Sequence, residues 1–362
     1  MNRARAAAFP LLLLTLACAS DSDAQAVAGI TVPAGFLIEQ FADGLAGVRT
    51  LKIGPDGMLY AAQSSRGRIV VLDPAGPVGQ SAVEVMAGLD RPYGMAFHDG
   101  ALYVGEEGQV VRLDGPDYAT PTVVIPDLPT GGHWTRELVF GTDGLLYVSV
   151  GSSCNVCEES DPRRAAVTRY RPDGSGMEIV ATGLRNAAGL AVHPGTGAIW
   201  ASQNERDQIG DDIPPEEVNV LTDGTDFGWP FCYGDRIPNP EYRDEAARCA
   251  ATTPPALAMQ AHSAPLGMVF YTGEQFPEEW RGDLFVAFHG SWNRSRPTGY
   301  QLAHVDVKDG RPVSYEPFAH GWLGALGGVS GRPVYPVVGP DGSLYLSDDE
   351  GGRIYRIRWV GQ

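Results

Sequence analysis

Basic side chains are scarce in this sequence. Lys and Arg together number 27 against 44 Asp and Glu, so the formal net charge of the 362 residues is −17 at pH 7. Only Lys52 and Lys308 are lysines. Contacts with nucleic-acid phosphates need clustered positive charge, so this balance argues against a nucleic-acid-binding surface, and no nucleic-acid partner is expected.

Long apolar runs are also missing beyond the N-terminus, so no transmembrane segment is expected. The one early run, residues 6–17, follows Arg3 and Arg5 and is too short to span a bilayer. A small-x-small sequence, Ala24-Gln25-Ala26, comes shortly after it. This pattern predicts a signal peptide over residues 1–26 and a periplasmic or secreted mature chain. Cys18 is an alternative site of lipid attachment.

Cysteine is rare, and the predicted mature chain has four: Cys154, Cys157, Cys232 and Cys249. An even number in an exported protein favours disulfides, although the connectivity stays open. For the Cys154-x-x-Cys157 motif, a redox dithiol and half of a zinc site are alternatives. No second such motif and no thioredoxin-like pattern accompanies it, which favours a structural disulfide. A disulfide between Cys232 and Cys249 would close a loop and contribute about 3 kcal/mol to stability.

Helical periodicity of useful length is absent, whereas glycine and proline are abundant, with 46 Gly and 28 Pro. So many turn-forming residues in a chain that is 43% hydrophobic are typical of short strands joined by tight turns. One phrase recurs: a glycine turn, an apolar-aromatic pair, and then small or β-branched residues. The six copies are GPDGMLYAAQ (54–63), HDGALYVGEE (98–107), GTDGLLYVSVG (141–151), PGTGAIWASQ (194–203), RGDLFVAFHG (281–290) and GPDGSLYLSDD (339–349).

Each copy predicts the same hairpin, because its turn glycine, preceded by Asp or Thr in five of the six copies, supplies the positive φ of a tight turn. A further strand follows, as at residues 68–73 and 109–114. Three or four short antiparallel strands in roughly 50 residues are typical of a propeller blade. The sequence therefore predicts an all-β fold, a six-bladed β-propeller, as a single domain over residues 27–362. We expect residues 35–41 to complete the last blade, and an insertion at about 205–262.

Four basic groups stand at matching positions in the repeat. Arg49, His133, Arg185 and Arg332 each precede the apolar inner strand of a different copy. Because inner strands converge on a central channel, we expect these side chains to face one axis. Their repulsion favours a multiply charged anionic ligand between them, and the alternative is that each pairs with a nearby acid. His133 lies in a Gly-Gly loop and suits a general base, with His262 as the competitor.

Oxygen ligands gather after the fourth copy. The segment SQNERDQIGDD (202–212) is rich in carboxylate and amide side chains. Calcium favours about six to eight oxygen ligands, so this segment is a candidate calcium loop, although its spacing is not that of an EF-hand. The alternative is a solvated acidic loop.

Taken together, several segments resemble the family of glucose/sorbosone dehydrogenases that depend on pyrroloquinoline quinone (PQQ), and most closely its sorbosone branch. The segments run in order from about residue 130 to 350 and are GGHWTRELVFGTDGLLYVSVGSSCNVCEE, GLRNAAGLAVHPGTG, ASQNERDQIGDD, DFGWPFCYG, APLGMVFYTG, FVAFHGSWNRSRPTGY and GRPVYPVVGPDGSLYLSDD. The resemblance implies a six-bladed propeller, in agreement with the repeat count.

The resemblance also implies roles for individual residues. His133 matches the histidine that abstracts the substrate hydroxyl proton, while a hydride passes from the sugar to the quinone. Arg185 matches the arginine that stabilises the developing oxyanion, and both are the candidate catalytic residues. The cofactor contacts that the resemblance implies are Arg49, Tyr93, His133, Arg185, Asn186, Trp292, Arg294 and Arg332. Residues 204–206 match the loop whose main-chain carbonyls bind calcium. With the neighbouring acids, the candidate metal ligands are Asn204, Glu205, Arg206, Asp207 and Asp212.

The chain departs from the family pattern at three places. The glucose-dehydrogenase branch has a lysine near the cofactor, whereas both lysines of this chain lie elsewhere, and Arg294 is the candidate substitute. Gly132 stands where that branch has an aspartate, so the activation of His133 does not carry over directly. Trp134 replaces a smaller residue of the sorbosone branch and is expected to narrow the substrate pocket.

The leading hypothesis is a PQQ- and calcium-dependent dehydrogenase that oxidises a sugar or a sugar-derived aldehyde. Its electrons would leave to an external acceptor such as a cytochrome. One alternative is a calcium-dependent lactonase, a hydrolase that needs no organic cofactor and leaves the four basic groups unexplained. The other is a non-catalytic propeller that binds a glycan or a protein, against which the presence of His133 with Arg185-Asn186 argues.

Overall fold

A computed structural model describes residues 27–361 of the chain. The predicted signal peptide and the lipid-attachment site at Cys18 lie outside the described residues. Within them, the only α-helix is α1 (Ala246–Ala251), and no helix has the length and apolar character needed to cross a membrane. The short 3₁₀ helices of this part are η1 (Ser64–Arg66), η2 (Pro240–Tyr242) and η3 (Glu278–Trp280).

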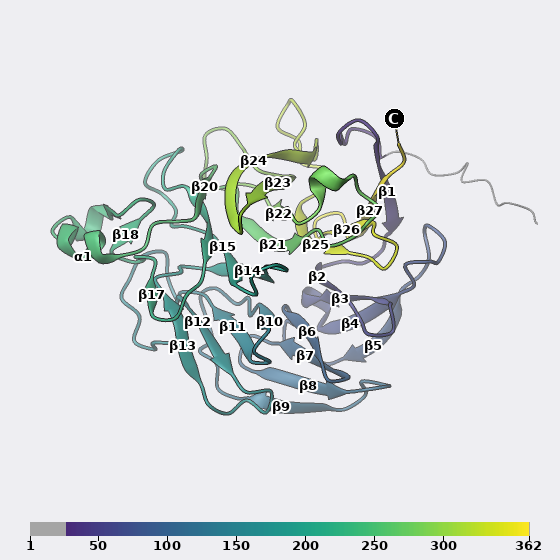
Figure 1. The fold of residues 1–362 in the computed structure, drawn as a ribbon, viewed down its shortest axis with the longest axis horizontal. Helices are drawn as coiled ribbons and strands as arrows, with labels where there is room; N and C mark the ends of the chain where they lie inside the picture. The colour runs from purple at the N-terminus through teal and green to yellow at the C-terminus, as the bar shows by residue number, and fades with distance from the viewer. Residues whose placement is uncertain (1–26, 362) are drawn as a thin grey trace, which may run out of the picture.

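Six antiparallel sheets follow one another around a ring (Figure 1). Blade 1 consists of β2 (Val48–Ile53), β3 (Leu59–Gln63), β4 (Arg68–Leu72) and β5 (Val83–Ala87). Blade 2 consists of β6 (Met95–His98), β7 (Ala101–Gly105), β8 (Val110–Asp114) and β9 (Pro121–Ile125). Blade 3 consists of β10 (Leu138–Phe140), β11 (Leu146–Val150), β12 (Ala166–Tyr170) and β13 (Glu178–Thr182), with β17 (Thr225–Asp226) added in parallel.

The second half of the ring repeats this arrangement. Blade 4 consists of β14 (Ala187–Val192), β15 (Ile199–Gln203), β16 (Glu216–Val220) and β20 (Leu257–Met259). Blade 5 consists of β21 (Pro265–Phe270), β22 (Leu284–Phe288), β23 (Gln301–Lys308) and β24 (Arg311–His320). Blade 6 consists of β25 (Pro333–Val338), β26 (Leu344–Asp348), β27 (Arg353–Trp359) and β1 (Phe36–Ala42). The prediction of an all-β, six-bladed propeller is confirmed.

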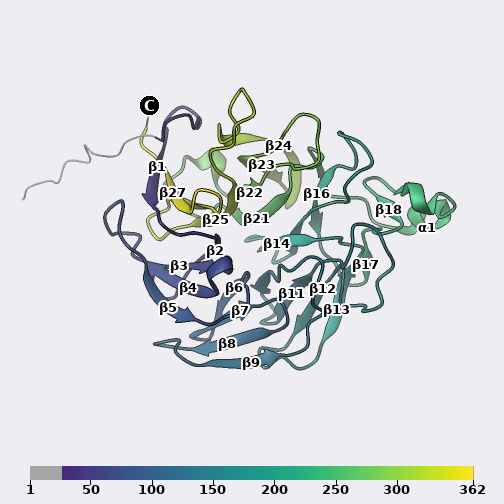
Figure 2. The same ribbon diagram turned by 180° about the vertical axis from the view of Figure 1, so that it is seen from behind.

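The two ends of the described chain close the ring. Strand β1 pairs antiparallel with β27, so the first strand supplies the outer edge of the last blade, as Figures 1 and 2 show. The pairing covers the free edge that β27 would otherwise expose. The prediction that residues 35–41 complete the last blade is therefore confirmed, with the strand one residue further along the chain.

The recurring phrase forms the turn and the second strand of every blade. Its turn glycines all have φ between 73° and 87°, a conformation that favours glycine; they are Gly57, Gly100, Gly144, Gly197, Gly282 and Gly342. Its aromatic residues are all buried: Tyr60, Tyr103, Tyr147, Trp200, Phe285 and Tyr345. The turn thus fixes the register of each hairpin, and the aromatic ring fills the space between blades.

The innermost strands β2, β6, β10, β14, β21 and β25 contact one another in this order around the axis. The predicted insertion at 205–262 contains three of the blade strands: β16 and β20 of blade 4, and β17 of blade 3. Its remaining part, with β18 (Cys232–Tyr233), β19 (Ile237–Pro238) and α1, projects from the rim (Figure 1). The Cys232–Cys249 disulfide holds this projection together, and a Cys154–Cys157 disulfide lies after β11, so both predicted disulfides are confirmed.

Candidate functional site

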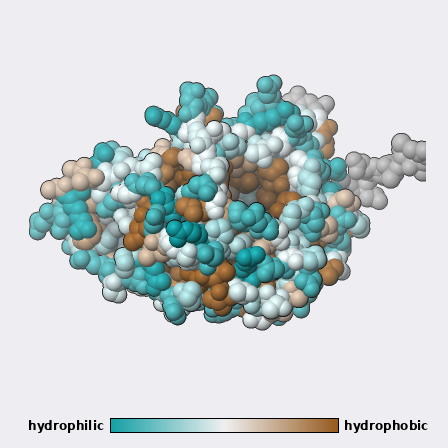
Figure 3. Space-filling model, turned by 60° about the horizontal axis from the view of Figure 1, so that its bottom comes forward, coloured by the Kyte–Doolittle hydropathy of each residue, from teal (hydrophilic) through white to brown (hydrophobic). Residues whose placement is uncertain are grey.

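A pocket of about 170 Å³ opens where loops from several blades meet at one end of the central channel. Figure 3 shows one face of the ring, with hydrophilic residues on the rim and hydrophobic residues visible in the recessed centre. The predicted site residues that line the pocket are His133, Arg185, Asn204, Glu205, Asp207, Trp292 and Arg332. Further lining residues include His262, Glu216, His289 and Asn293. The structure thus brings together groups that are up to about 200 residues apart in sequence (His133 and Arg332).

Ser152 holds the imidazole of His133 at its Nδ1 edge. Its Nδ1 lies 3.0 Å from both the carbonyl oxygen and the Oγ of Ser152. The Ser152 hydroxyl donates to the Cys154 carbonyl at 2.7 Å, so its oxygen accepts from His133. Both neighbours of Nδ1 are therefore acceptors, which places the imidazole proton on Nδ1. The Nε2 atom keeps its lone pair and has no hydrogen bond to another residue of the described chain.

Burial and the positive charge of Arg185 lower the pKa of His133 to about 4. The ring is therefore neutral near neutral pH and is able to accept a proton. Gly132 allows the His133 loop to approach Ser152 closely. Its φ is +69°, and an added Cβ would lie 2.5 Å from the Ser152 carbonyl oxygen. The aspartate of the glucose-dehydrogenase branch has no room at this position.

Arg185 is nearly enclosed by acceptors. Its Nη1 donates to the main-chain carbonyls of Asn204 at 3.3 Å and of Glu205 at 2.8 Å. Its Nη2 donates to the Asp207 carboxylate at 3.2 Å and to the Asn155 side chain at 3.1 Å. Of the carbonyls of residues 204–206, which the resemblance assigned to calcium, those of Asn204 and Glu205 therefore converge on a cationic group, which in this structure is the guanidinium of Arg185.

Arg332 is the least neutralised of the four predicted basic groups. Its side chain contacts the Tyr300 hydroxyl and the Nδ1 of His289, and within the described residues it forms no ion pair. Arg49, in contrast, pairs with Asp349 at 2.8 Å, and the same carboxylate accepts from His289. Burial alone would raise the pKa of Asp349, but the His289 hydrogen bond and the nearby arginines outweigh it and lower that pKa.

Several predicted site residues lie outside the pocket lining. The Tyr93 hydroxyl donates to the Ala188 carbonyl inside the channel, and the Asn186 side chain accepts from Thr135. Arg206 turns away from the pocket toward Glu241. Arg294 and Asp212, predicted for cofactor and metal respectively, pair with each other at 3.0 Å.

Trp134 also lies apart from the pocket lining. Its ring lies under the guanidinium groups of Arg91 and Arg49 and edge-on to Tyr93. The expected narrowing of the substrate pocket by this indole stays a prediction.

His262 lines the pocket but has both ring nitrogens engaged. Its Nε2 lies 2.8 Å from the Gly210 carbonyl, and its Nδ1 lies 3.4 Å from the Asn293 side-chain nitrogen. A carbonyl only accepts, so Nε2 carries the proton and Nδ1 accepts from Asn293. Between the two candidate bases, the geometry favours His133.

A buried glutamate that sequence reasoning missed, Glu216, lies behind the calcium-loop segment. Glu216 accepts from the main-chain nitrogens of Glu205 and Ala264, and burial raises its pKa to about 8. Burial also raises the pKa of Glu205. These residues stand on β16 and in the loop after β15, and the signal available in the sequence was the run of acids extending to Glu217.

A second polar cluster lies deeper, between inner strands of three blades. The Lys52 ammonium donates to the Tyr335 hydroxyl at 2.7 Å, and that hydroxyl donates to Glu137 at 2.8 Å. Lys52 and Glu137 also form an ion pair at 3.7 Å. Glu137 is fully buried, and this burial raises its pKa to about 7.

The pocket residues fit the groups that the resemblance implies. An anionic quinone needs uncompensated positive charge, and Arg332 supplies it at the pocket wall. Calcium needs convergent oxygens, and the carbonyls of Asn204 and Glu205 already converge on a cation beside the Asp207 carboxylate. The fit requires calcium to share the carbonyls of Asn204 and Glu205 with Arg185, through the second lone pair of each oxygen.

The fold and the pocket together define a six-bladed propeller with a partly neutralised cationic site at one end of its channel. A sequence model of the family described as TrAA12-like matches residues 30–360. The chain belongs to this TrAA12-like family.

Three relatives are similar in sequence to this chain. An uncharacterized protein of Borreliella burgdorferi is 30% identical over 91% of this chain and 90% of its own length. The aldose sugar dehydrogenase YliI of Escherichia coli is 28% identical over 67% of this chain and 64% of its own. The pyrroloquinoline quinone-dependent pyranose dehydrogenase of Coprinopsis cinerea is 26% identical over 91% of this chain, which spans 54% of that protein.

Solved structures show the same fold. The holo PQQ domain of the Coprinopsis cinerea pyranose dehydrogenase superposes with a TM-score of 0.79 at 22% identity, covering 93% of this chain and 99% of that domain. A calcium structure of a family AA12 carbohydrate-active enzyme from Trichoderma reesei gives 0.78 at 21% identity, covering 91% and 97%. The predicted resemblance to PQQ-dependent sugar dehydrogenases is confirmed, and the sorbosone branch stays a prediction.

Proposed function

We propose that this protein is a PQQ- and calcium-dependent dehydrogenase that oxidises a sugar or a sugar-derived aldehyde and passes the electrons to an external acceptor. The observation that carries the proposal is the combination of a free His133 Nε2 with the Arg185 and Arg332 guanidinium groups around one pocket. The family relationship supports the same reaction class.

His133 is the general base in this proposal. Its Nε2 receives the proton of the sugar hydroxyl while the carbon that bears this hydroxyl loses a hydride. The quinone, when bound, supplies the two-electron acceptor for that hydride. Because the pKa of His133 is lowered, the ring holds no proton at neutral pH and is ready to accept one.

The arginines are proposed to bind and orient the cofactor. Arg332, with no ion pair in the described chain, attracts a cofactor carboxylate. Arg49, whose charge is paired with Asp349, stays a proposal as a further cofactor contact. Arg185 stands next to His133 and supplies a cation for negative charge that develops on the cofactor oxygen. Asn186, Tyr93 and Arg294 remain proposals as cofactor contacts.

Calcium is proposed to use the carbonyl oxygens of Asn204 and Glu205, with Asp207 as the nearest carboxylate. The Asp212 carboxylate pairs with Arg294, which makes it a poorer candidate, whereas the Arg206 side chain pairs with Glu241 and its main-chain carbonyl stays a proposed ligand. A cation at this place would also stabilise the buried Glu205 and Glu216 in their charged forms.

The sugar is proposed to enter over Trp292. This residue lines the pocket and is 69% exposed, so the face of its indole is open to a sugar ring.

The predicted periplasmic or secreted location agrees with two disulfides. A cytochrome is the proposed electron acceptor, and the net charge of −17 suits a basic partner.

A calcium-dependent lactonase remains the second candidate, because carboxylates and amides also line the pocket: Asn204, Asp207, Glu216 and Asn293.

One assay separates the candidates. Purified protein is incubated with PQQ and calcium, and dye reduction is followed with aldoses, sorbosone-like aldehydes and lactones. Reduction that requires PQQ supports the dehydrogenase. Lactone hydrolysis without PQQ supports the lactonase, and neither activity supports a binding propeller.

A further inference from the structure

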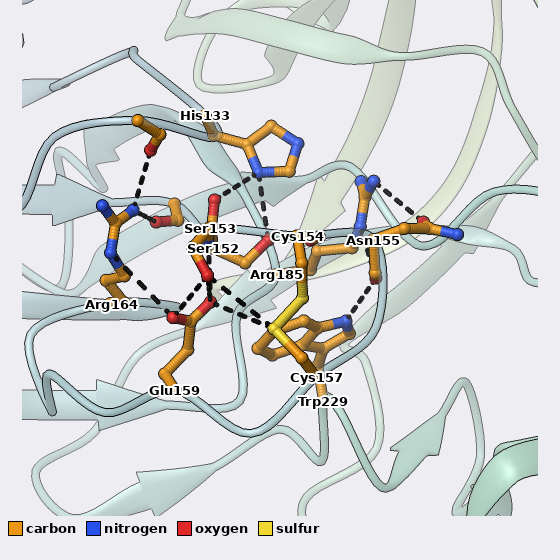
Figure 4. Close-up of a disulfide and its surroundings, with 12 residues drawn as sticks. His133, Ser152, Ser153, Cys154, Asn155, Cys157, Glu159, Arg164, Arg185 and Trp229 are labelled. Atoms are coloured by element: carbon orange, nitrogen blue, oxygen red, sulfur yellow. Dashed lines mark hydrogen bonds and ion pairs between the residues drawn. A yellow bond between two sulfur atoms is a disulfide. The ribbon is translucent and has the colours of Figure 1, made fainter.

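The segment that follows β11 contacts both proposed catalytic residues. Residues 152–157, here named the positioning loop, are closed by the Cys154–Cys157 disulfide. Figure 4 shows His133 and Arg185 on one side of this loop and the disulfide beneath them. The segment stood out in the sequence only for its two cysteines, and the proposed reaction leaves it without a role.

The first residue of the loop links the two catalytic residues through its backbone. The Ser152 carbonyl accepts from the His133 main-chain nitrogen at 3.0 Å, and the Ser152 main-chain nitrogen donates to the Arg185 carbonyl at 2.8 Å. The Ser152 side chain and carbonyl also hold His133 Nδ1. Ser152 is completely buried, so water does not compete for these contacts.

Asn155 holds the other side of the pocket. Its main-chain and side-chain oxygens accept from Arg185 at 3.2 and 3.1 Å. The same side chain accepts from the Asp207 main-chain nitrogen at 2.8 Å and donates to the Asp207 carbonyl at 3.1 Å. One asparagine therefore ties Arg185 to the segment that carries the candidate calcium ligands.

The outer side of the loop is anchored to the His133 loop. Glu159 accepts from the Ser153 main-chain nitrogen at 2.6 Å, and Arg164 forms an ion pair with Glu159 at 3.9 Å. Arg164 also donates to the carbonyls of Thr130 and Gly131, three and two residues before His133. The disulfide closes the turn between these inner and outer contacts, and Ser153 Oγ lies 3.7 Å from the Cys157 sulfur.

We propose that the positioning loop, kept closed by its disulfide, sets the active geometry of this site: Ser152 fixes the tautomer and direction of His133, and Asn155 fixes Arg185 against residues 204–207. Ser152 and Asn155 are thus positioning residues, which act through His133 and Arg185. The inference rests on the proposed dehydrogenase function for its catalytic meaning, while the contacts themselves do not depend on it.

The test compares two disulfide variants. Cys154→Ser/Cys157→Ser opens the positioning loop, and Cys232→Ser/Cys249→Ser is the matched control in the projection. We expect opening the positioning loop to lower kcat about tenfold or more with a smaller change in KM, because orientation of the base is lost. The control is expected to keep kcat but to lose more thermal stability, because its cysteines are 17 residues apart rather than 3.

Asn155→Ala tests the contact with Arg185 directly. It is expected to lower kcat and weaken PQQ binding, and Asn155→Asp is expected to recover most of both, because it keeps the oxygen that receives Arg185 Nη2 and Asp207 N. A purely structural role would instead lower the thermal stability of both variants alike. Wild-type kcat and PQQ affinity in Asn155→Ala, or no recovery in Asn155→Asp, would overturn the assignment.

A readout that needs no turnover separates this inference from the proposed function. In ¹⁵N-histidine-labelled protein, the His133 signal, identified by its loss in His133→Ala, is expected to show the Nδ1-protonated tautomer. Opening the positioning loop is expected to mix the two tautomers. If the signal changes as expected but no sugar is oxidised, the positioning role stands and the dehydrogenase proposal fails. If sugars are oxidised and the signal is the same in the open loop, the positioning role is wrong.

Discussion

The mouth of the central channel, where the pocket opens, and the interior of the channel both carry ionisable side chains. The two regions differ in how many of these side chains are partnered by other residues. In the interior, Lys52, Tyr335 and Glu137 bond to one another, and Glu137 Oε2 alone among their polar side-chain atoms lacks a hydrogen-bond partner in the described chain. At the mouth, Arg332 has no ion pair in the described chain, and the Nε2 of His133 is free. The interior cluster joins blades and leaves no charge for a ligand, whereas the mouth presents positive charge and a base. Function is therefore expected at the mouth and stability in the interior.

The largest expected effect is at the mouth. His133→Ala removes the only proposed base, and turnover should fall by roughly a thousandfold, as for other general bases. PQQ should still bind, because the arginines remain. Dye reduction and a PQQ titration check this, with His320→Ala on exposed strand β24 as the control. A near-normal rate would show that His133 is not the base.

Lys52→Met is the matching change in the interior. It leaves Glu137 buried without its cation, so the free energy of unfolding should fall by about 3 kcal/mol. PQQ affinity should stay as in the wild type, since the cluster lies apart from the pocket lining. Denaturant unfolding and the PQQ titration measure the two quantities. A large loss of PQQ affinity with intact folding would contradict the separation of the two regions.

The interior cluster also predicts a pH dependence of stability. Burial raises the pKa of Glu137 from 4.5 to about 7, so the folded state keeps a proton that the unfolded state has lost. Stability should therefore fall as pH rises between these two values, by at most about 3 kcal/mol from this group. Glu137→Gln should flatten this part of the curve relative to wild type. Parallel curves for the two proteins would show that Glu137 does not titrate there.

Arg332→Met is expected to have the smallest effect. Loss of one charged contact should weaken PQQ binding about tenfold, or roughly 1.4 kcal/mol. Thermal stability should hardly change, because no ion pair is broken in the described chain. Arg311→Met on an exposed strand end is the control. Equal PQQ affinities for both variants would mean that Arg332 does not face the cofactor.

The fold could be predicted from sequence because each blade repeats the same turn glycine and aromatic residue, such as Gly57 with Tyr60. The positions of His133, Arg185 and Arg332 followed from their common offset before an inner strand. The offset places a residue in the right loop but does not give the direction of its side chain. The resemblance behind Arg294 and the acidic segment that contains Asp212 gave no side-chain direction either, and the two residues, assigned to cofactor and metal, pair with each other.

Other site residues had no local signal at all. Asn155 and Asp349 act through contacts with residues from other blades, and such contacts exist only once the ring has closed. Ser152 could have been suspected from its place after a buried strand, but its contact with His133 depends on the close approach of Gly132. Long-range geometry, not composition, decides these roles.

The most direct measurement mixes protein loaded with stoichiometric PQQ and calcium with an excess of one aldose at neutral pH, and follows the absorbance of the quinone in a single turnover. The proposed function predicts rapid reduction of the bound quinone in the wild type and loss of this phase in His133→Ala. Tight PQQ binding with no reduction by any sugar or sugar-derived aldehyde would contradict it.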